Sequence, residues 1–276
     1  MVGRFANDKA RQRFSEVYEA QRARWPGPAE ELDVPTAFGT TRVRRSGTGP
    51  ALVLLHGVFG NSLTWRHHAE TLGAHHTLYA VDTIGEPGLS AQTADLTGAE
   101  DCASWLSSVL TGLSLARPHL AGISRGAWLA LNLAAREPSA VGGVHAVEPA
   151  GFGRVGARFH LSSLVTFAGL AFPSLVPRRA RVDETARQAV KPLLGVAFGY
   201  RVQVPPILPL SDDELRAVTA PVRVLLGERS EIHRTAEVTA RLTTVRPDWD
   251  VRVVPGGTHA LSLRRPDLVD GFLLDA

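Results

Sequence analysis

The sequence predicts an α/β fold in which a mostly parallel, doubly wound sheet is flanked by helices. Four apolar runs of strand length alternate with helical segments, at residues 51–55, 77–81, 119–123 and 141–147. Strands that are apolar throughout need a cover on both faces of the sheet, which is typical of parallel sheets. After an interruption that begins at residue 151, the strand pattern resumes at residues 221–226 and 251–254.

The amino-terminal part precedes this alternation and is expected to add a helix and a hairpin. Residues 4–25 follow an amphipathic pattern with Phe14 and Tyr18 on one side, and a Trp-Pro-Gly-Pro sequence stops the pattern. Residues 36–39 and 41–45 are predicted to be two short strands, followed by a run of turn-forming residues. We expect the hairpin at an edge of the sheet and the helix against the body of the protein.

Three further helices are expected between the apolar strands. The first opens at Asn61 or Ser62, because both residue types cap helix amino termini. The second covers residues 99–113 and the third covers residues 125–136, where apolar residues recur with helical spacing.

The interruption is too long for a plain loop in a compact domain, so we expect a helical lid (cap) insertion at residues 151–212. The core of the protein would then consist of residues 1–150 and 213–276. Within the insertion, residues 159–177 carry no Asp, Glu, Lys or Arg. They do contain prolines and polar side chains, so we do not expect a membrane span there.

The composition excludes several other classes of protein. The chain has 276 residues, 44% of them hydrophobic and 21% charged, which is typical of a folded globular domain. The 30 basic and 27 acidic residues give a net charge of +3, a weak excess that predicts no nucleic-acid partner. Cys102 is the single cysteine, and residues 1–14 are too charged for a signal peptide. We therefore expect a cytoplasmic protein, while the oligomeric state stays open.

The strongest functional motif is the sequence Gly-Ile-Ser-Arg-Gly at residues 122–126. It follows an apolar strand and opens a helix, which is the setting that a G-x-S-x-G nucleophile elbow requires. On such a sharp turn, only glycine at the two flanking positions leaves room for the serine. The motif therefore predicts Ser124 as a nucleophile.

A second motif, His-Gly-Val-Phe-Gly at residues 56–60, follows the first apolar strand. Acyl transfer needs two backbone N–H groups that converge on the developing oxyanion, and a glycine-rich loop after this strand can supply one of them. We expect Val58 and Arg125 to provide this oxyanion hole. His56 is expected to have a structural role within the loop.

A third motif, Gly-Gly-Thr-His at residues 256–259, follows the last strand and presents a histidine late in the chain. A general base for the serine is expected at this place. The pairs at residues 67–68 and 75–76 are adjacent histidines, which point in different directions on a helix and cannot share one metal ion. We expect neither a metal site nor a cofactor.

The order of these motifs resembles the α/β-hydrolase family, in which a strand, a His-Gly loop, a serine elbow, a lid and a terminal histidine follow one another. The sequence Asp-Thr-Ile-Gly-Glu-Pro-Gly-Leu-Ser at residues 82–90 fits the same order. The Trp-Pro segment and residues 36–43 and 128–133 further resemble a bacterial carboxylesterase-like branch. The resemblance covers nearly the whole chain outside the lid and implies Ser124 as nucleophile and His259 as base.

The third catalytic residue departs from the family. Its carboxylate usually lies about three residues after the glycine that ends the penultimate strand, and this position is Ser230 here. A serine cannot supply the negative charge that stabilises an imidazolium. Glu148 is our preferred acid, because it directly follows the fourth apolar strand and some family members, notably one group of haloalkane dehalogenases, take their acid from that strand end. Glu231 is the alternative acid if the loop is shifted by one residue, and Glu228, Asp82 or no acid remain as further alternatives.

These residues predict a serine hydrolase that cleaves a carboxylic ester, thioester or lactone of a small apolar substrate. The apolar stretch in the expected lid favours an apolar substrate. Because the acid is missing from its usual position, a non-hydrolytic enzyme on the same scaffold, such as a cyclase, epimerase or lyase of secondary metabolism, is the alternative. A ligand-binding protein with a vestigial site is a third hypothesis.

Overall fold

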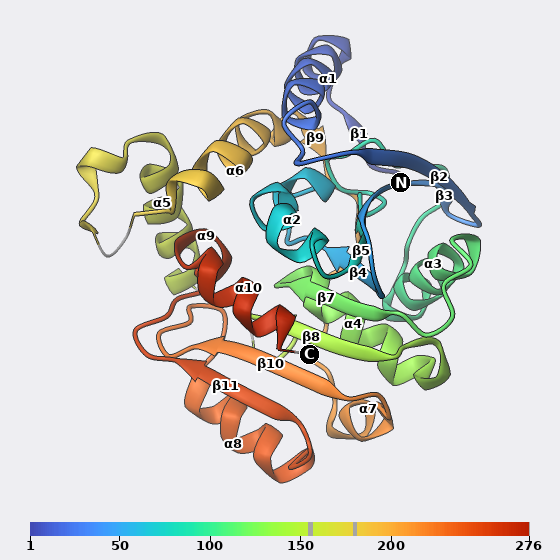
Figure 1. Cartoon of the computed structure of the whole chain (residues 1–276), viewed down its shortest axis with the longest axis vertical. Helices are drawn as coiled ribbons and strands as arrows, with labels where there is room; N and C mark the ends of the chain where they lie inside the picture. Colours follow the sequence, from blue (N-terminus) through green and yellow to red (C-terminus); the bar gives the residue numbers. More distant parts are fainter. Residues whose placement is uncertain (154–156, 179–180, 276) are drawn as a thin grey trace.

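The computed structural model describes residues 1–153, 157–178 and 181–275, so parts of the expected insertion, residues 154–156 and 179–180, lie outside the described residues. The structure contains one large sheet (Figure 1). Its strands are β2 (Ala29–Thr36), β3 (Gly39–Gly47), β4 (Ala51–Leu55), β5 (Thr77–Val81), β6 (Ala91–Gln92), β7 (His119–Ile123), β8 (Gly143–Val147), β10 (Val222–Gly227) and β11 (Asp250–Val254).

The strand order is β11-β10-β8-β7-β4-β5-β3-β2, and β6 pairs with β3. All neighbours from β11 to β5 pair in parallel, whereas β3 runs antiparallel to β5 and β2 runs antiparallel to β3. The sheet is therefore mostly parallel with an antiparallel hairpin at one edge, as the sequence predicts.

Helices cover both faces of the sheet. The α-helices outside the insertion are α1 (Asp8–Arg22), α2 (Arg66–Gly73), α3 (Ala99–Gly112), α4 (Arg125–Arg136), α8 (Thr235–Val245), α9 (Leu261–Arg264) and α10 (Pro266–Leu274). Successive side chains of a strand point to opposite faces of the sheet and so pack into two different hydrophobic cores. Leu54 of β4 belongs to the core under α1, α2 and α10, and Leu55 belongs to the core under α3, α4 and α8. The apolar runs in the sequence are thus strands buried on both faces.

The amino-terminal elements differ from the expectation in their bounds. The helix predicted at residues 4–25 is the shorter α1, which Asn7 caps by accepting a hydrogen bond from the backbone N–H of Ala10. The first hairpin strand covers β2 rather than residues 36–39, which mostly form the turn. β2 is rich in charged residues because it is an edge strand with one face toward solvent, and such strands show no apolar run.

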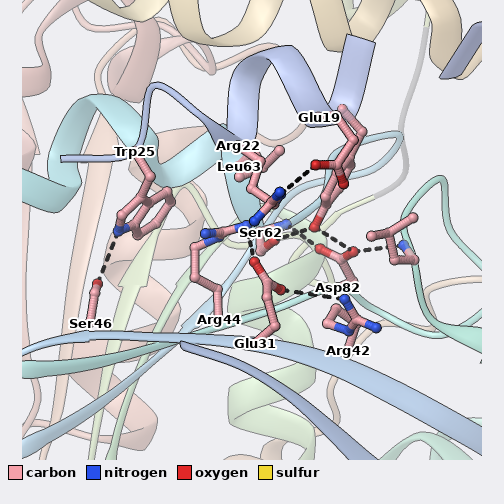
Figure 2. A network of polar contacts seen from close by, with 12 residues as sticks. Glu19, Arg22, Trp25, Glu31, Arg42, Arg44, Ser46, Ser62, Leu63 and Asp82 are labelled. Atoms are coloured by element: carbon pink, nitrogen blue, oxygen red, sulfur yellow. Dashed lines mark hydrogen bonds and ion pairs between the residues drawn. The ribbon is translucent and has the colours of Figure 1, made fainter. Parts of the chain in front are cut away.

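Polar contacts join α1 and the edge hairpin to the loops at the carboxyl ends of the strands (Figure 2). Glu31 of β2 forms an ion pair with the buried Arg44 of β3. Asp82, which follows β5, accepts hydrogen bonds from the backbone N–H of Ser62 (2.7 Å) and from the hydroxyl of Tyr18 on α1 (3.1 Å). The amino-terminal helix is therefore connected to the loops at this edge of the sheet.

The segment between β8 and β10 contains helices and one strand of a short antiparallel pair. Its elements are α5 (Ala157–Ala171), α6 (Glu184–Ala197), β9 (Tyr200–Arg201) and α7 (Asp212–Ala217), and β9 pairs with β1 (Arg4–Phe5). In Figure 1, α5 and α6 lie beside α9 and extend toward α1. Within the described ranges, no helix is long and apolar enough to cross a membrane.

Candidate active site

The residues predicted for the site lie in loops that leave the carboxyl ends of parallel strands. Ser124 follows β7, Glu148 follows β8, and His259 lies in the loop after β11. Because these strands belong to the parallel part of the sheet, their carboxyl ends share one edge. The structure thus gathers residues from distant parts of the chain at a single edge.

Ser124 occupies a sharp turn between β7 and α4. Its φ of 55° and ψ of −111° form an uncommon backbone conformation for a residue with a side chain. A Cβ atom on Gly122 would lie 2.3 Å from the backbone nitrogen of Ala127, and one on Gly126 would lie 2.1 Å from the carbonyl oxygen of Leu55. Both flanking positions therefore need glycine, and the strand-turn-helix setting of the predicted elbow is present.

Ser124 and His259 line the same cavity, which has a volume of about 220 Å³. The polar part of its wall includes Thr64, Thr166 and Ser262. The apolar part of its wall consists of Val58, Ile123, Leu170, Val190, Leu194, Ala260 and Leu263. The sequence predicts an apolar insertion near the site, but it does not identify which residues of α5 and α6 reach the cavity.

The loop at residues 56–60 approaches Ser124 from the end of β4. A Cβ atom on Gly57 would lie 3.6 Å from the Cβ of Ser124, and Val58 lines the cavity. In the described part of the chain, no hydrogen bond occupies the backbone N–H of Val58 or that of Arg125. Val58 lines the cavity, and Arg125 directly follows Ser124, which also lines it.

His56 is held inside its loop by both ring nitrogens. The Nδ1–H donates to the carbonyl of Gly57 (2.7 Å), and Nε2 accepts from the backbone N–H of Thr83 (3.0 Å). Burial lowers the pKa of His56, although the bond to Gly57 opposes this effect. A neutral imidazole with a hydrogen bond at each ring nitrogen fits the structural role expected for this residue.

Glu148 is buried and contacts the ring of His259. Its Oε2 lies 3.1 Å from His259 Nδ1 and also accepts a hydrogen bond of 2.5 Å from Ser230 Oγ, and its Oε1 accepts from the backbone N–H of Gly227. Burial alone would raise the pKa of Glu148, but His259 and the donors from Gly227 and Ser230 outweigh burial and hold it below its ordinary value. The carboxylate is therefore charged beside the imidazole at neutral pH.

The other candidate acids make different contacts. Ser230, which stands at the family's usual acid position, donates to Glu148. Glu231 accepts a hydrogen bond from the backbone N–H of His259 (2.9 Å), and Glu228 accepts from the backbone N–H of Gly256 (2.8 Å). Both contacts shape the loop after β11.

Asp82 joins separate loops at this edge of the sheet through hydrogen bonds of its carboxylate. Besides Ser62 and Tyr18, it accepts from the backbone N–H of Leu89 (2.7 Å). Its three partners come from three separate segments, so Asp82 joins the ends of β4 and β5 to α1.

Glu86 is a buried carboxylate at the site that the sequence does not identify. It accepts a hydrogen bond from the backbone N–H of Phe59 (3.0 Å), and its Oε1 lies 3.6 Å from Nε of Arg125. The signal available in the sequence is a glutamate between glycine and proline in a loop beside the site. This signal does not reveal the partners of Glu86, because both are distant in sequence.

The adjacent histidines of α2 have separate partners. His67 Nε2 bonds the carbonyl of Ser262 (3.0 Å), whereas His68 Nδ1 bonds Asp270 (2.5 Å). Burial lowers the pKa of each histidine to about 3, so both are neutral. Among the described residues, no group of three or more His, Cys, Asp or Glu side chains is arranged to hold a metal ion.

Comparisons with known proteins identify the family of this chain. Residues 52–270 match the model of the alpha/beta hydrolase family. Carboxylesterase YbfK of Bacillus subtilis is 27% identical over 98% of this chain and 95% of that protein. The 2-(acetamidomethylene)succinate hydrolase of Mesorhizobium japonicum is 26% identical over 83% of this chain and 88% of that protein.

Solved structures agree as well. The crystal structure of naproxen esterase (carboxylesterase NP) from Bacillus subtilis matches with a TM-score of 0.82 at 25% identity, and the match covers 96% of each chain. The family model covers most of the sequence, and carboxylesterases are similar along nearly the whole chain. The chain therefore belongs to the alpha/beta hydrolase family and is a carboxylesterase-like enzyme.

Proposed function

We propose that the protein hydrolyses carboxylic esters of small apolar substrates through a triad of Ser124, His259 and Glu148. The observation that carries this proposal is the 3.1 Å contact between Glu148 Oε2 and His259 Nδ1, on a histidine that shares its cavity with Ser124. Each residue also follows a strand at the same edge of the sheet. Thioesters and lactones have the same reacting carbonyl group and are included in the proposal.

In the proposed reaction, Ser124 Oγ attacks the carbonyl carbon while His259 Nε2 accepts the hydroxyl proton. The charge of Glu148 stabilises the imidazolium and keeps the remaining ring proton on Nδ1. The backbone N–H groups of Val58 and Arg125 donate to the oxyanion of the tetrahedral intermediate. His259 then passes its proton to the leaving alcohol, and a water molecule hydrolyses the acyl-enzyme by the same steps.

The cavity supports an apolar substrate. Its wall contains aliphatic side chains from the core and from α5 and α6, and no Asp, Glu, Lys or Arg is among the described residues that line it. We extend the proposal to the insertion at residues 151–212, in which α5 and α6 act as a lid that supplies Leu170, Val190 and Leu194 to the substrate pocket.

The hypothesis of a non-hydrolytic reaction depended on the missing acid at Ser230. Ser230 donates to Glu148, and Glu148 contacts the imidazole that would need the acid. The substitution at the usual position therefore gives no reason to prefer a cyclase, epimerase or lyase over an esterase.

The test is covalent labelling of Ser124. A fluorophosphonate should add one adduct to the wild-type chain, and Ser124→Ala should abolish both the adduct and the hydrolysis of p-nitrophenyl butyrate, measured by intact mass and absorbance. Ser262→Ala is the matched control, because Ser262 lines the same cavity but does not lie on the elbow. A wild-type chain that gains no adduct and releases no p-nitrophenol would overturn the proposal.

A further inference from the structure

Glu86 lies between the two backbone segments that would form the oxyanion hole. Its side chain is fully buried and does not line the substrate cavity. Oε2 accepts a hydrogen bond of 3.0 Å from the backbone N–H of Phe59, the residue after Val58. Oε1 lies 3.6 Å from Nε of Arg125, the residue after Ser124. One carboxylate therefore contacts the neighbour of one proposed donor and the side chain of the other.

The first contact supports a backbone that would otherwise be strained. Phe59 has a φ of 60°, in the left-handed region that is unfavourable for a residue with a side chain. The bond from its N–H to a buried carboxylate offsets this cost, because hydrogen bonds to charged groups are among the stronger ones. The turn also contains a bond from Gly60 N–H to the carbonyl of Gly57 (3.1 Å). Together these bonds fix the peptide plane that carries the N–H of Val58.

The second contact holds a buried cation. The side chain of Arg125 is about 5% exposed, lies over the ring of Trp128 and donates from Nη1 to the carbonyl of Pro205 (3.2 Å). A buried guanidinium needs a nearby negative charge, and Glu86 supplies it. The residue that offers the second oxyanion donor is thereby fixed through its own side chain.

We propose that Glu86 is a positioning residue for catalysis, which aligns both oxyanion donors by bonding Phe59 N–H and pairing with Arg125. This inference rests on the proposed function, since it assumes that the N–H groups of Val58 and Arg125 bind an oxyanion. Glu86 touches no substrate. It acts on the transition state through the backbone of the loop and the first turn of α4.

The same network reaches the segment that returns from the insertion to the core. Gln203 N–H donates to the carbonyl of Gly85 (3.0 Å), next to Glu86, while the ring of Phe198 lies 5.7 Å from that of Phe59. Pro205 accepts from Arg125. The backbone beside Glu86 and the side chain of Arg125 thus also contact the segment that returns from the insertion, and Glu86 and Arg125 are both buried.

The charge of Glu86 depends on pH in the neutral range. Burial raises its pKa to about 7, although Arg125 and the Phe59 N–H oppose this effect. The other ionisable groups in this neighbourhood are Tyr200 of β9 beside Glu86, and His56 and Cys102 of α3 beside Arg125. As the pH falls through 7, the carboxylate becomes neutral, the pairing with Arg125 is lost, and the alignment weakens.

The experiment compares Glu86→Gln and Glu86→Ala with the wild type on p-nitrophenyl butyrate. Removal of an oxyanion donor lowers kcat about 100- to 1000-fold. Misalignment of the donors should therefore lower kcat about tenfold in Glu86→Gln and somewhat more in Glu86→Ala. KM should change less than about twofold, because the substrate pocket is untouched. Glu137→Gln is the control, since Glu137 accepts from Ser107 Oγ near the other end of α4.

A pH profile separates positioning from a merely structural role. The ratio of wild-type kcat to Glu86→Gln kcat should be largest above pH 8 and approach one below pH 6, where the wild-type carboxyl is neutral like the amide. Any pH dependence that the variant shares with the wild type cancels in the ratio. A ratio that stays constant with pH, or a change in KM alone, contradicts the inference.

Two further outcomes are distinguishable. If Glu86→Ala does not fold, Glu86→Gln, whose circular dichroism must match the wild type, decides the question alone. If the wild type itself neither hydrolyses the ester nor binds fluorophosphonate, the proposed function fails. If the wild type is active and both Glu86 variants match it at pH 8.5, the inference about Glu86 fails while the proposed function stands.

Discussion

Glu148 contacts His259 from the end of β8, and Ser230 stands where the family usually has its acid. If Glu148 supplies the negative charge, Glu148→Gln should keep the side-chain size and lower kcat by about 1000- to 10000-fold at neutral pH, as charge removal does in a related triad. Glu231→Gln is the matched control and should lower kcat less than about tenfold, because Glu231 accepts a hydrogen bond from the backbone N–H of His259. Steady-state kinetics with p-nitrophenyl butyrate measure both.

The reverse ranking of these two variants would assign the acid to Glu231. Small losses in both would mean that His259 works without a carboxylate, and circular dichroism must first show that each variant folds.

The places of Ser124 after β7 and of Glu148 after β8 were predictable from the local sequence, but their contacts with distant residues were not. Ser124 follows from two glycines and a strand, and Glu148 from its place directly after an apolar strand. The contact of Glu148 with His259 depends on strand order, since 111 positions separate the two residues. The role of Ser230 as a donor and the burial of Glu86 likewise arise only when distant loops meet.

At the scale of elements, the sequence predicts most of the central part of the sheet closely, although β8 begins at Gly143 and not at residue 141. The predicted bounds of β4, β5, β7 and α4 are confirmed without a shift, because these strands are apolar throughout and the elbow fixes where α4 begins. Prediction fails at the edge, where β2 carries Glu30, Glu31 and Asp33 and presents little apolar surface. The pair β1 and β9 is only two residues long in each strand, which is too short for any pattern.

The proposed lid helices lead to a prediction about substrate choice. Leu194 of α6 lines the cavity, so Leu194→Ala should enlarge it and favour longer acyl chains. The ratio of kcat/KM for p-nitrophenyl octanoate to that for the butyrate should rise by about three- to tenfold, because burial of one methylene group contributes about 0.8 kcal/mol, or about fourfold. Leu175→Ala, at a side chain that is 78% exposed, should leave the ratio unchanged.

Fluorophosphonate labelling of Ser124 should persist in both leucine variants, because the elbow is separate from α6. If Leu194→Ala lowers the melting temperature but leaves the chain-length ratio as it is, α6 is a structural helix and the lid proposal is wrong.

At the scale of the whole molecule, the amino-terminal helix and the insertion share a hydrophobic core with the sheet. Phe14 of α1, Leu193 of α6, Leu54 of β4 and Phe272 of α10 belong to one buried cluster. This arrangement joins segments from both ends and the middle of the chain, and no local pattern predicts it. The cluster also lies on the side of the sheet where Tyr18 reaches Asp82 and the loops of the site.

This shared core makes α1 a determinant of global stability. Phe14 is fully buried, so Phe14→Ala should lower the free energy of unfolding by about 3–5 kcal/mol, the usual cost of such a cavity. For a domain of this size the melting temperature should fall by roughly 6–20 °C in a thermal scan. Arg13→Ala, at an exposed position on the same helix, should change the free energy of unfolding by less than about 0.5 kcal/mol. At 15 °C the Phe14→Ala protein should still label at Ser124, because Ser124 is not a member of this cluster. An unchanged melting temperature would instead mean that α1 folds and unfolds independently of the sheet.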